Sequence, residues 1–86
     1  MQGRRVDAIE GAVLPKLEPG DYGKDSCGSW WVCPPRGGYA LIDPRKGWTA
    51  TENADGTLTV SPSIFMTAPE EHKWHGYLEK GVWREC

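Results

Sequence analysis

The sequence predicts a mainly β protein, a small antiparallel meander of barrel or sandwich type with a loop-rich or short-helical N-terminal part. Short runs of β-branched and aromatic residues recur about every ten residues in the later part of the chain. Eleven glycines and seven prolines separate these runs, which is typical of a chain with many turns. A chain of 86 residues allows one domain, with the β-rich core placed over residues 26–86.

The first 25 residues carry the weakest structural signals. Val6, Ile9 and Val13 recur at helical spacing, which allows one short amphipathic helix over residues 2–13. Residues 15–29 are expected to form a loop, because prolines and glycines interrupt any pattern there. We therefore expect this part to be a short helix followed by a loop, or to be poorly ordered.

The remaining elements follow from alternation and from turn residues. Five to seven strands are expected, with candidates over residues 29–33, 39–43, 48–52, 57–61, 64–66, 74–78 and 82–84. Leu58 and Val60 alternate with threonines after a loop that ends in Gly56, which predicts a hairpin. Pro62 cannot donate to a strand ladder, so residues 61–63 are expected to interrupt pairing. Residues 68–72 predict one helical turn.

Charge and hydropathy exclude several classes of function. Ten Lys and Arg face twelve Asp and Glu, so a broad basic surface for nucleic acid or an anionic membrane is not expected. No run approaches the roughly 18 apolar residues of a spanning helix. Asp7 and Glu10 break the apolar start, which argues against a signal peptide. The expected location is the cytoplasm, where the three cysteines stay reduced.

Five tryptophans dominate the apolar content. Trp30 and Trp31 are adjacent, so on a strand their side chains point to opposite faces of the sheet. One of these faces is then either covered by a second packed layer or forms an exposed aromatic patch. The N-terminal segment is one candidate cover for both. Trp30, Trp31 and Trp74 are the expected exposed aromatics of a protein-binding surface, because tryptophan is enriched at binding hot spots. A second copy of the chain is a further candidate partner.

Cysteine and histidine raise two chemical alternatives. Cys27, Cys33, His75 and Cys86 are the candidate ligands of a structural zinc site, with His72 close by in sequence. The wide spacing of the first two cysteines differs from a tight zinc knuckle, and the other interpretation makes the thiols ordinary packing residues. Cys27, in a glycine-flanked loop, is the candidate nucleophile of a third alternative, a hydrolytic or transfer enzyme.

The serines of the Ser-Pro-Ser segment are interpreted as structural. Ser61 and Ser63 flank Pro62, and their hydroxyls can cap loose backbone groups at the bend. Since no base lies near either serine in the sequence, a catalytic role is not expected.

Two segments resemble a known family. Residues 57–64, Thr-Leu-Thr-Val-Ser-Pro-Ser-Ile, resemble the Thr-Phe-Ser-Pro-Ser-Ile segment of small phage and prophage proteins of unknown function, some labelled ammonia monooxygenase. Residues 74–83 are similar to the Cys-His-Ser-Phe-Val-x-x-Gly-x-Ile hairpin that follows it there, with Trp74 in place of the cysteine and His75 at the matching histidine. The resemblance implies a phage or prophage product, a β-rich fold and a zinc site.

Together these observations predict a non-enzymatic phage-type protein that binds an unknown protein partner and needs no cofactor. The alternative is a small structural zinc-binding domain. If the resemblance holds, the cytoplasm is that of a bacterial host.

Overall fold

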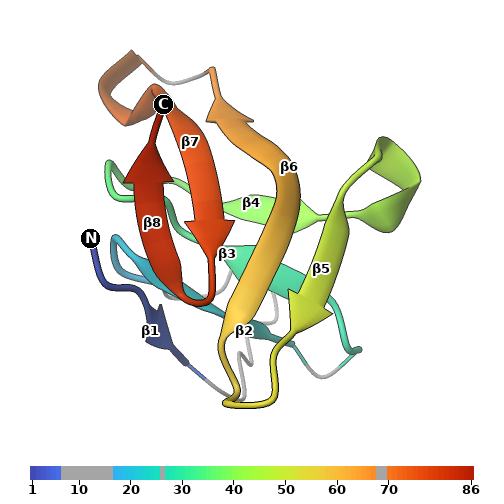
Figure 1. The fold of residues 1–86 in the computed structure, drawn as a ribbon. Coiled ribbons are helices and arrows are strands. Elements are labelled where there is room, and N and C mark those ends of the chain that lie inside the picture. Colours follow the sequence, from blue (N-terminus) through green and yellow to red (C-terminus); the bar gives the residue numbers. More distant parts are fainter. Residues whose placement is uncertain (7–16, 26, 68–69) are drawn as a thin grey trace.

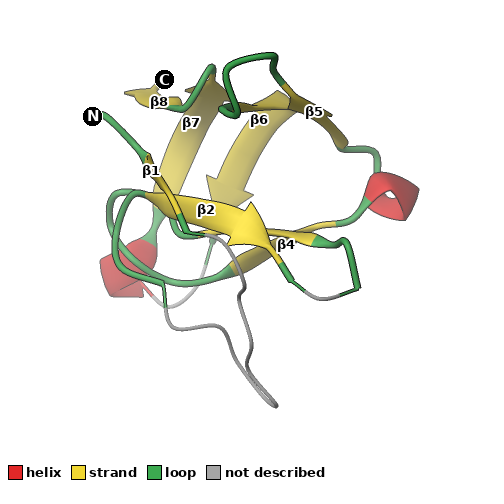
Figure 2. Ribbon diagram, turned by 90° about the horizontal axis from the view of Figure 1, so that it is seen from below, coloured by secondary structure: helices red, strands yellow, loops and turns green. Residues whose placement is uncertain are grey.

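The fold consists of two four-stranded sheets packed face to face (Figures 1 and 2). The computed structural model describes residues 1–6, 17–25, 27–67 and 70–86. The elements are β1 (Arg4–Arg5), β2 (Asp21–Lys24), β3 (Trp30–Val32), β4 (Ala40–Ile42), η1 (Pro44–Lys46), β5 (Thr49–Glu52), β6 (Leu58–Met66), η2 (Glu70–His72), β7 (Trp74–Glu79) and β8 (Val82–Glu85). The predicted mainly β class is confirmed, as a sandwich rather than a closed barrel.

The strands follow sequence order within each sheet. The first sheet has the order β1-β2-β3-β4 and the second β5-β6-β7-β8. β1 runs parallel to β2, and every other named pairing is antiparallel. In Figure 1, β6 crosses the front of the molecule with β7 and β8 on one side and β5 on the other. The second sheet therefore presents one face to the core and the other to solvent.

Both sheets contribute to one hydrophobic core. Its buried members are Tyr22, Trp30, Val32, Ile42, Leu58, Val60, Ile64, Trp74, Leu78 and Trp83. The rings of Trp74 and Trp83 meet edge to face with centroids 5.5 Å apart. The Trp83 indole N–H donates to the carbonyl of Gly20 at 2.9 Å, a buried bond to the turn before β2. Trp83 thus joins the second sheet to the first.

The predicted exposure of two tryptophans is wrong. Trp30 is 8% exposed and Trp74 is 4% exposed, because both side chains point between the sheets and complete the core. Trp31, on the opposite face of β3, is half-buried against Leu17 and Cys33. Its indole N–H donates to the Asp25 carboxylate at 2.9 Å. The three residues do not form an exposed aromatic surface.

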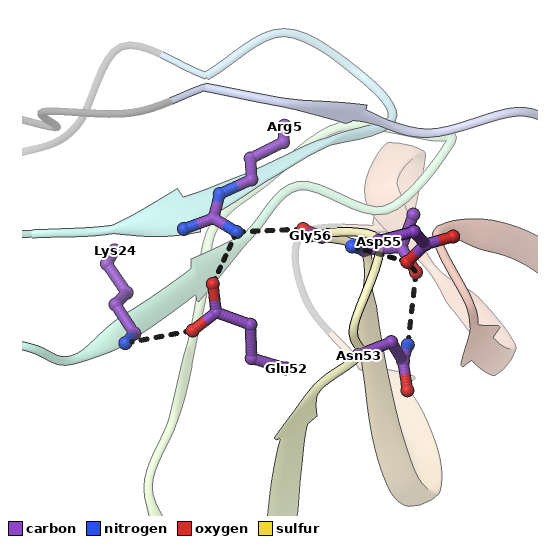
Figure 3. A network of polar contacts seen from close by, with 7 residues as sticks. Arg5, Lys24, Glu52, Asn53, Asp55 and Gly56 are labelled. Carbon is purple, nitrogen blue, oxygen red and sulfur yellow. Dashed lines mark hydrogen bonds and ion pairs between the residues drawn. The ribbon is translucent and has the colours of Figure 1, made fainter.

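An ion-pair network closes the sandwich at one side (Figure 3). Glu52, at the end of β5, accepts hydrogen bonds from Arg5 at 2.7 Å and from Lys24 at 3.3 Å. Arg5 also donates to the carbonyl of Gly56 at 2.8 Å. The guanidinium of Arg5 and the ammonium of Lys24 both lie over the Trp30 ring, 5.3 and 5.1 Å from its centroid. Two cations of the first sheet are therefore held by one carboxylate of the second.

This network predicts a pH-dependent contribution to stability. The hydrogen bond from Arg5, and after it the bond from Lys24, hold the pKa of Glu52 below its ordinary value of 4.5. A lowered pKa stabilises the fold above the unfolded-state pKa, and that stabilisation disappears as the pH falls through the folded-state pKa. Glu52→Gln is therefore expected to lower the melting temperature near neutral pH, and the difference should narrow as the pH falls through the lowered pKa of Glu52. Thermal denaturation at about pH 7 and about pH 3 tests this, and an equal difference at both pH values contradicts it.

Several boundaries differ from the sequence-based expectations. Residues 21–24 form β2 within the predicted loop, because pairing with β3 supplies the order that their composition does not. Arg4 and Arg5 form a strand within the predicted helix, whose other residues from 7 onward lie outside the described ones. Glu70–His72 confirms a helical turn, while residues 68–69 lie outside the described part. No helix in the described residues is long and apolar enough to cross a membrane.

Candidate active site

A serine and a histidine meet on the solvent face of the second sheet. The Oγ atom of Ser63 lies 2.9 Å from Nε2 of His75. Ser63 comes from β6 and His75 from β7, 12 positions later in the chain. Ser63 is half-buried and His75 is exposed, so the pair is open to solvent. No base lies near Ser63 in the sequence, but the two antiparallel strands place His75 beside it in the fold.

The strand register explains how the two side chains meet. Phe65 lies directly opposite His75, and Met66 opposite Trp74. The register then shifts between Val60 and Ile64, so β6 continues through the predicted interruption as a bulged strand. The Ser61–Pro62 peptide bond within this bulge is cis. An irregular segment of β6 therefore carries Ser63 beside a regular segment of β7.

Three contacts hold the pair in place. The Trp48 indole N–H donates to the carbonyl of Ser63 at 3.1 Å. The Phe65 ring packs edge to face on the imidazole of His75, with centroids 4.9 Å apart and planes at 88°. At the end of β8, the N–H of Cys86 donates to the carbonyl of His75 at 3.0 Å. The backbones of both residues and the ring of the histidine are thus supported by neighbours.

Gly76 is required by close packing beneath His75. A Cβ atom at this position would collide with the carbonyl oxygen of Arg84 and would lie 2.6 Å from Cζ2 of Trp74. The indole of Trp74 thus covers the inner side of Gly76, and β8 lies tightly against it. This packing holds β7 close to Trp74 and β8, and it thereby positions His75, whose side chain lies on the opposite face.

The arrangement has the chemistry of a nucleophile and its base. With the imidazole protonated on Nδ1, Nε2 accepts the hydrogen bond from the serine hydroxyl and can take its proton. Among the described residues, no carboxylate bonds the second ring nitrogen of His75. We therefore describe Ser63 and His75 as a dyad.

The proposed zinc ligands lie apart in the fold. Cys27 lies in a turn of the first sheet where its N–H donates to the Asp25 carboxylate at 2.9 Å, and Cys33 is buried beyond the end of β3. Cys86 and His75 are neighbours through the backbone bond between β8 and β7. In the described part of the chain, no group of three or more His, Cys, Asp or Glu residues is placed to hold a metal ion. Cys27 and Cys33 therefore belong to the first sheet, whereas His75 and Cys86 belong to the second.

The cysteines are expected to differ sharply in reactivity. Burial, followed by the nearby charge of Asp21, raises the pKa of Cys33 to about 11, which leaves about one thiolate in a thousand near pH 8. Cys27 and Cys86 are exposed. Titration of the native protein with a chromogenic disulfide is expected to modify these two thiols quickly and Cys33 only after unfolding. Cys33→Ala should lower the total number of thiols that react after unfolding, while the number that reacts quickly in the native protein stays the same. A fast reaction of Cys33 in the native protein contradicts the prediction.

His72 does not join the dyad. It lines a pocket of about 700 Å³ together with Trp31, Cys33, Tyr39 and Met66. Its ring lies against the turn at Gly37 and Gly38, where a Cβ atom would approach it to 3.1 and 3.2 Å. Its buried Nδ1 has no hydrogen-bond partner in the described structure. A smaller pocket of about 350 Å³ lies near Trp30 and Leu41. Ser63 and His75 line neither pocket.

Comparison with known families places the chain in a class of proteins. A family described as bacterial ubiquitination-like system serine protease (BubE) matches residues 13–86. The chain belongs to the BubE family. Searches of curated proteins and of solved structures found no match.

Membership of the BubE family corrects three predictions. The resemblance to phage and prophage proteins of unknown function is wrong, because the matching family is bacterial and described as a serine protease. For the same reason, the prediction of a non-enzymatic binding protein is wrong, since the family name points to an enzyme. The alternative of a structural zinc domain is not supported either. The family description makes proteins the expected partners.

Proposed function

We propose that the chain is a serine protease in which Ser63 is the nucleophile and His75 is the general base. The observation that carries this proposal is the 2.9 Å contact between Ser63 Oγ and His75 Nε2, a distance suited to proton transfer. The description of the BubE family as a serine protease supports it independently.

The reaction follows from the two side chains. Ser63 Oγ attacks the carbonyl carbon of a peptide bond while His75 Nε2 accepts the hydroxyl proton. The C–N bond then breaks, the amine leaves with that proton, and the acyl group remains on Ser63 as an ester. Water attacks this ester, its proton passes to His75, and the acid is released as the proton returns to Ser63. Each step requires the serine and histidine to remain in contact.

The expected substrate is a polypeptide of the bacterial ubiquitination-like system that the family description names. An open pair on a sheet face supports a macromolecular substrate, since such a surface admits an extended segment without a channel. We further propose that the protein works in the cytoplasm. Association into a homodimer stays a prediction, and sedimentation velocity tests it.

A fluorophosphonate probe tests the proposed function directly. It reacts with an activated serine and leaves a stable phosphonyl ester on the oxygen. We expect stoichiometric labelling of the intact chain, and peptide mapping should place the label on Ser63. Prior unfolding should abolish the labelling, because the contact with His75 is lost. Labelling at another residue, or no labelling of the folded protein, contradicts the proposal.

A further inference from the structure

Two exposed aromatic side chains flank the dyad. Phe65 is 53% exposed and Tyr77 is 41% exposed. On β7, His75 and Tyr77 both point away from the core, while Trp74, Gly76 and Leu78 are buried. Phe65 pairs with His75 across the strands, so its side chain shares this face. We call the outer surface formed by Ser63, Phe65, His75 and Tyr77 the dyad face.

The register places the two rings on opposite sides of the reacting atoms. Phe65 contacts the imidazole of His75. In the proposed mechanism, His75 donates the proton to the leaving amine. Tyr77 lies opposite the bulged segment that carries Ser63, between the pairs Val60–Leu78 and Ile64–Gly76. Both Tyr77 and the pair of Ser63 and His75 lie on the outer face of the second sheet. An acyl group bound to Ser63 therefore emerges on the face that carries the Tyr77 ring.

We propose that Tyr77 selects a bulky apolar side chain on the residue whose carbonyl is attacked, and that Phe65 contacts the residue on the leaving side. This inference rests on the proposed function. The dyad face is expected to bind the substrate segment itself, because Phe65 and Tyr77 lie on the same surface as Ser63 and His75. A contact between aromatic rings adds preference beyond buried area, so the dyad face favours an aromatic residue at the cleaved bond over a small one.

The test uses peptidyl diphenyl phosphonates, which phosphonylate an activated serine. Two probes differ only in the side chain next to phosphorus, benzyl in one and methyl in the other. The second-order rate of inactivation is measured for the full-length chain. We expect the benzyl probe to react about tenfold faster with the unaltered protein. In Tyr77→Ala this ratio should fall to about one, while the methyl probe reacts at a nearly unchanged rate.

Tyr39→Ala is the matched control. Tyr39 is 40% exposed, close to the value for Tyr77, and it precedes β4 in the first sheet, away from the dyad. Its loss should leave the ratio intact. Tyr77→Thr, which places a β-branched residue with high strand propensity at this position, replaces the alanine variant if that variant does not fold.

The outcomes separate the inference from the proposed function. Equal rates for both probes, or a ratio that survives the loss of Tyr77, overturn the role of Tyr77 while leaving the dyad in place. Failure of both probes to modify Ser63 overturns the dyad and the inference together.

Discussion

Ser63→Ala is expected to lower kcat/KM for hydrolysis of a small ester such as 4-nitrophenyl acetate by about 10³-fold or more. The substitution removes the atom that forms the acyl intermediate in the proposed mechanism, while the backbone bond from Trp48 to the Ser63 carbonyl remains. His75→Gln should cause a loss of similar size, since an amide cannot accept the serine proton. Because the two residues act as a unit, the double variant should be no worse than either single variant.

Matched controls lie close to both positions. Ser61 is exposed and lies two positions before Ser63 in the same strand, and His72, the last residue of η2, lines a pocket to which neither Ser63 nor His75 contributes. Ser61→Ala and His72→Gln should retain activity within about threefold, provided that both variants fold. Initial rates over a range of ester concentrations measure all of these effects. Full activity of Ser63→Ala, or loss of activity in Ser61→Ala alone, would place the nucleophile elsewhere.

Trp83→Ala is expected to destabilise the fold by about 3–5 kcal/mol. The side chain is buried, packs against Trp74, and donates its indole N–H to Gly20 in the first sheet. Its removal leaves a cavity between the sheets and takes away one of the two hydrogen bonds to the Gly20 carbonyl, the other coming from the N–H of Arg4. A domain of this size has a narrow margin, so much of the population should unfold at physiological temperature. Chemical denaturation followed by circular dichroism measures the change.

Trp83→Phe separates the two causes. Phenylalanine retains an aromatic ring in the core but cannot donate to the carbonyl of Gly20, so its cost should be smaller, about 1–3 kcal/mol. If Trp83→Ala and Trp83→Phe destabilise equally, packing contributes little at this position. If neither destabilises, Trp83 does not join the sheets as described.

The sequence predicted most strands of the fold, because their signals are local. The two apolar runs around Gly81 identify β7 and β8 within one residue, whereas the single strand β6 was expected as two strands over residues 57–61 and 64–66. β2 carries no such signal, since Asp21 and Gly23 are poor strand formers that are ordered by pairing with β3. The exposure of the tryptophan side chains could not be derived from the local sequence pattern either. Trp30 and Trp74 are buried because the two sheets pack on them, and strand alternation does not say which face is covered.

The candidate active site was missed for a related reason. Ser63 was judged by its neighbours in sequence, whereas the relevant neighbour lies on the adjacent strand. The available signal was that the strands predicted over residues 64–66 and 74–78 follow one another in the chain. Antiparallel pairing of residues 64–66 with residues 74–76 brings Ser63 close to His75. The bulge that shifts the register near Pro62 could not be derived from alternation. The contact between Ser63 Oγ and His75 Nε2 therefore could not be predicted from the sequence.

The location of both proposed catalytic residues on two adjacent strands has a consequence for how this protein can change. The spacing between Ser63 and His75 is set by two adjacent strands, β6 and β7, and not by the fit of one sheet against the other. Substitutions that loosen the first sheet can therefore reduce lifetime without misaligning the chemistry. For the proposed reaction, stability and activity can thus be altered separately, provided that the supporting contacts from Trp48 and Cys86 are kept.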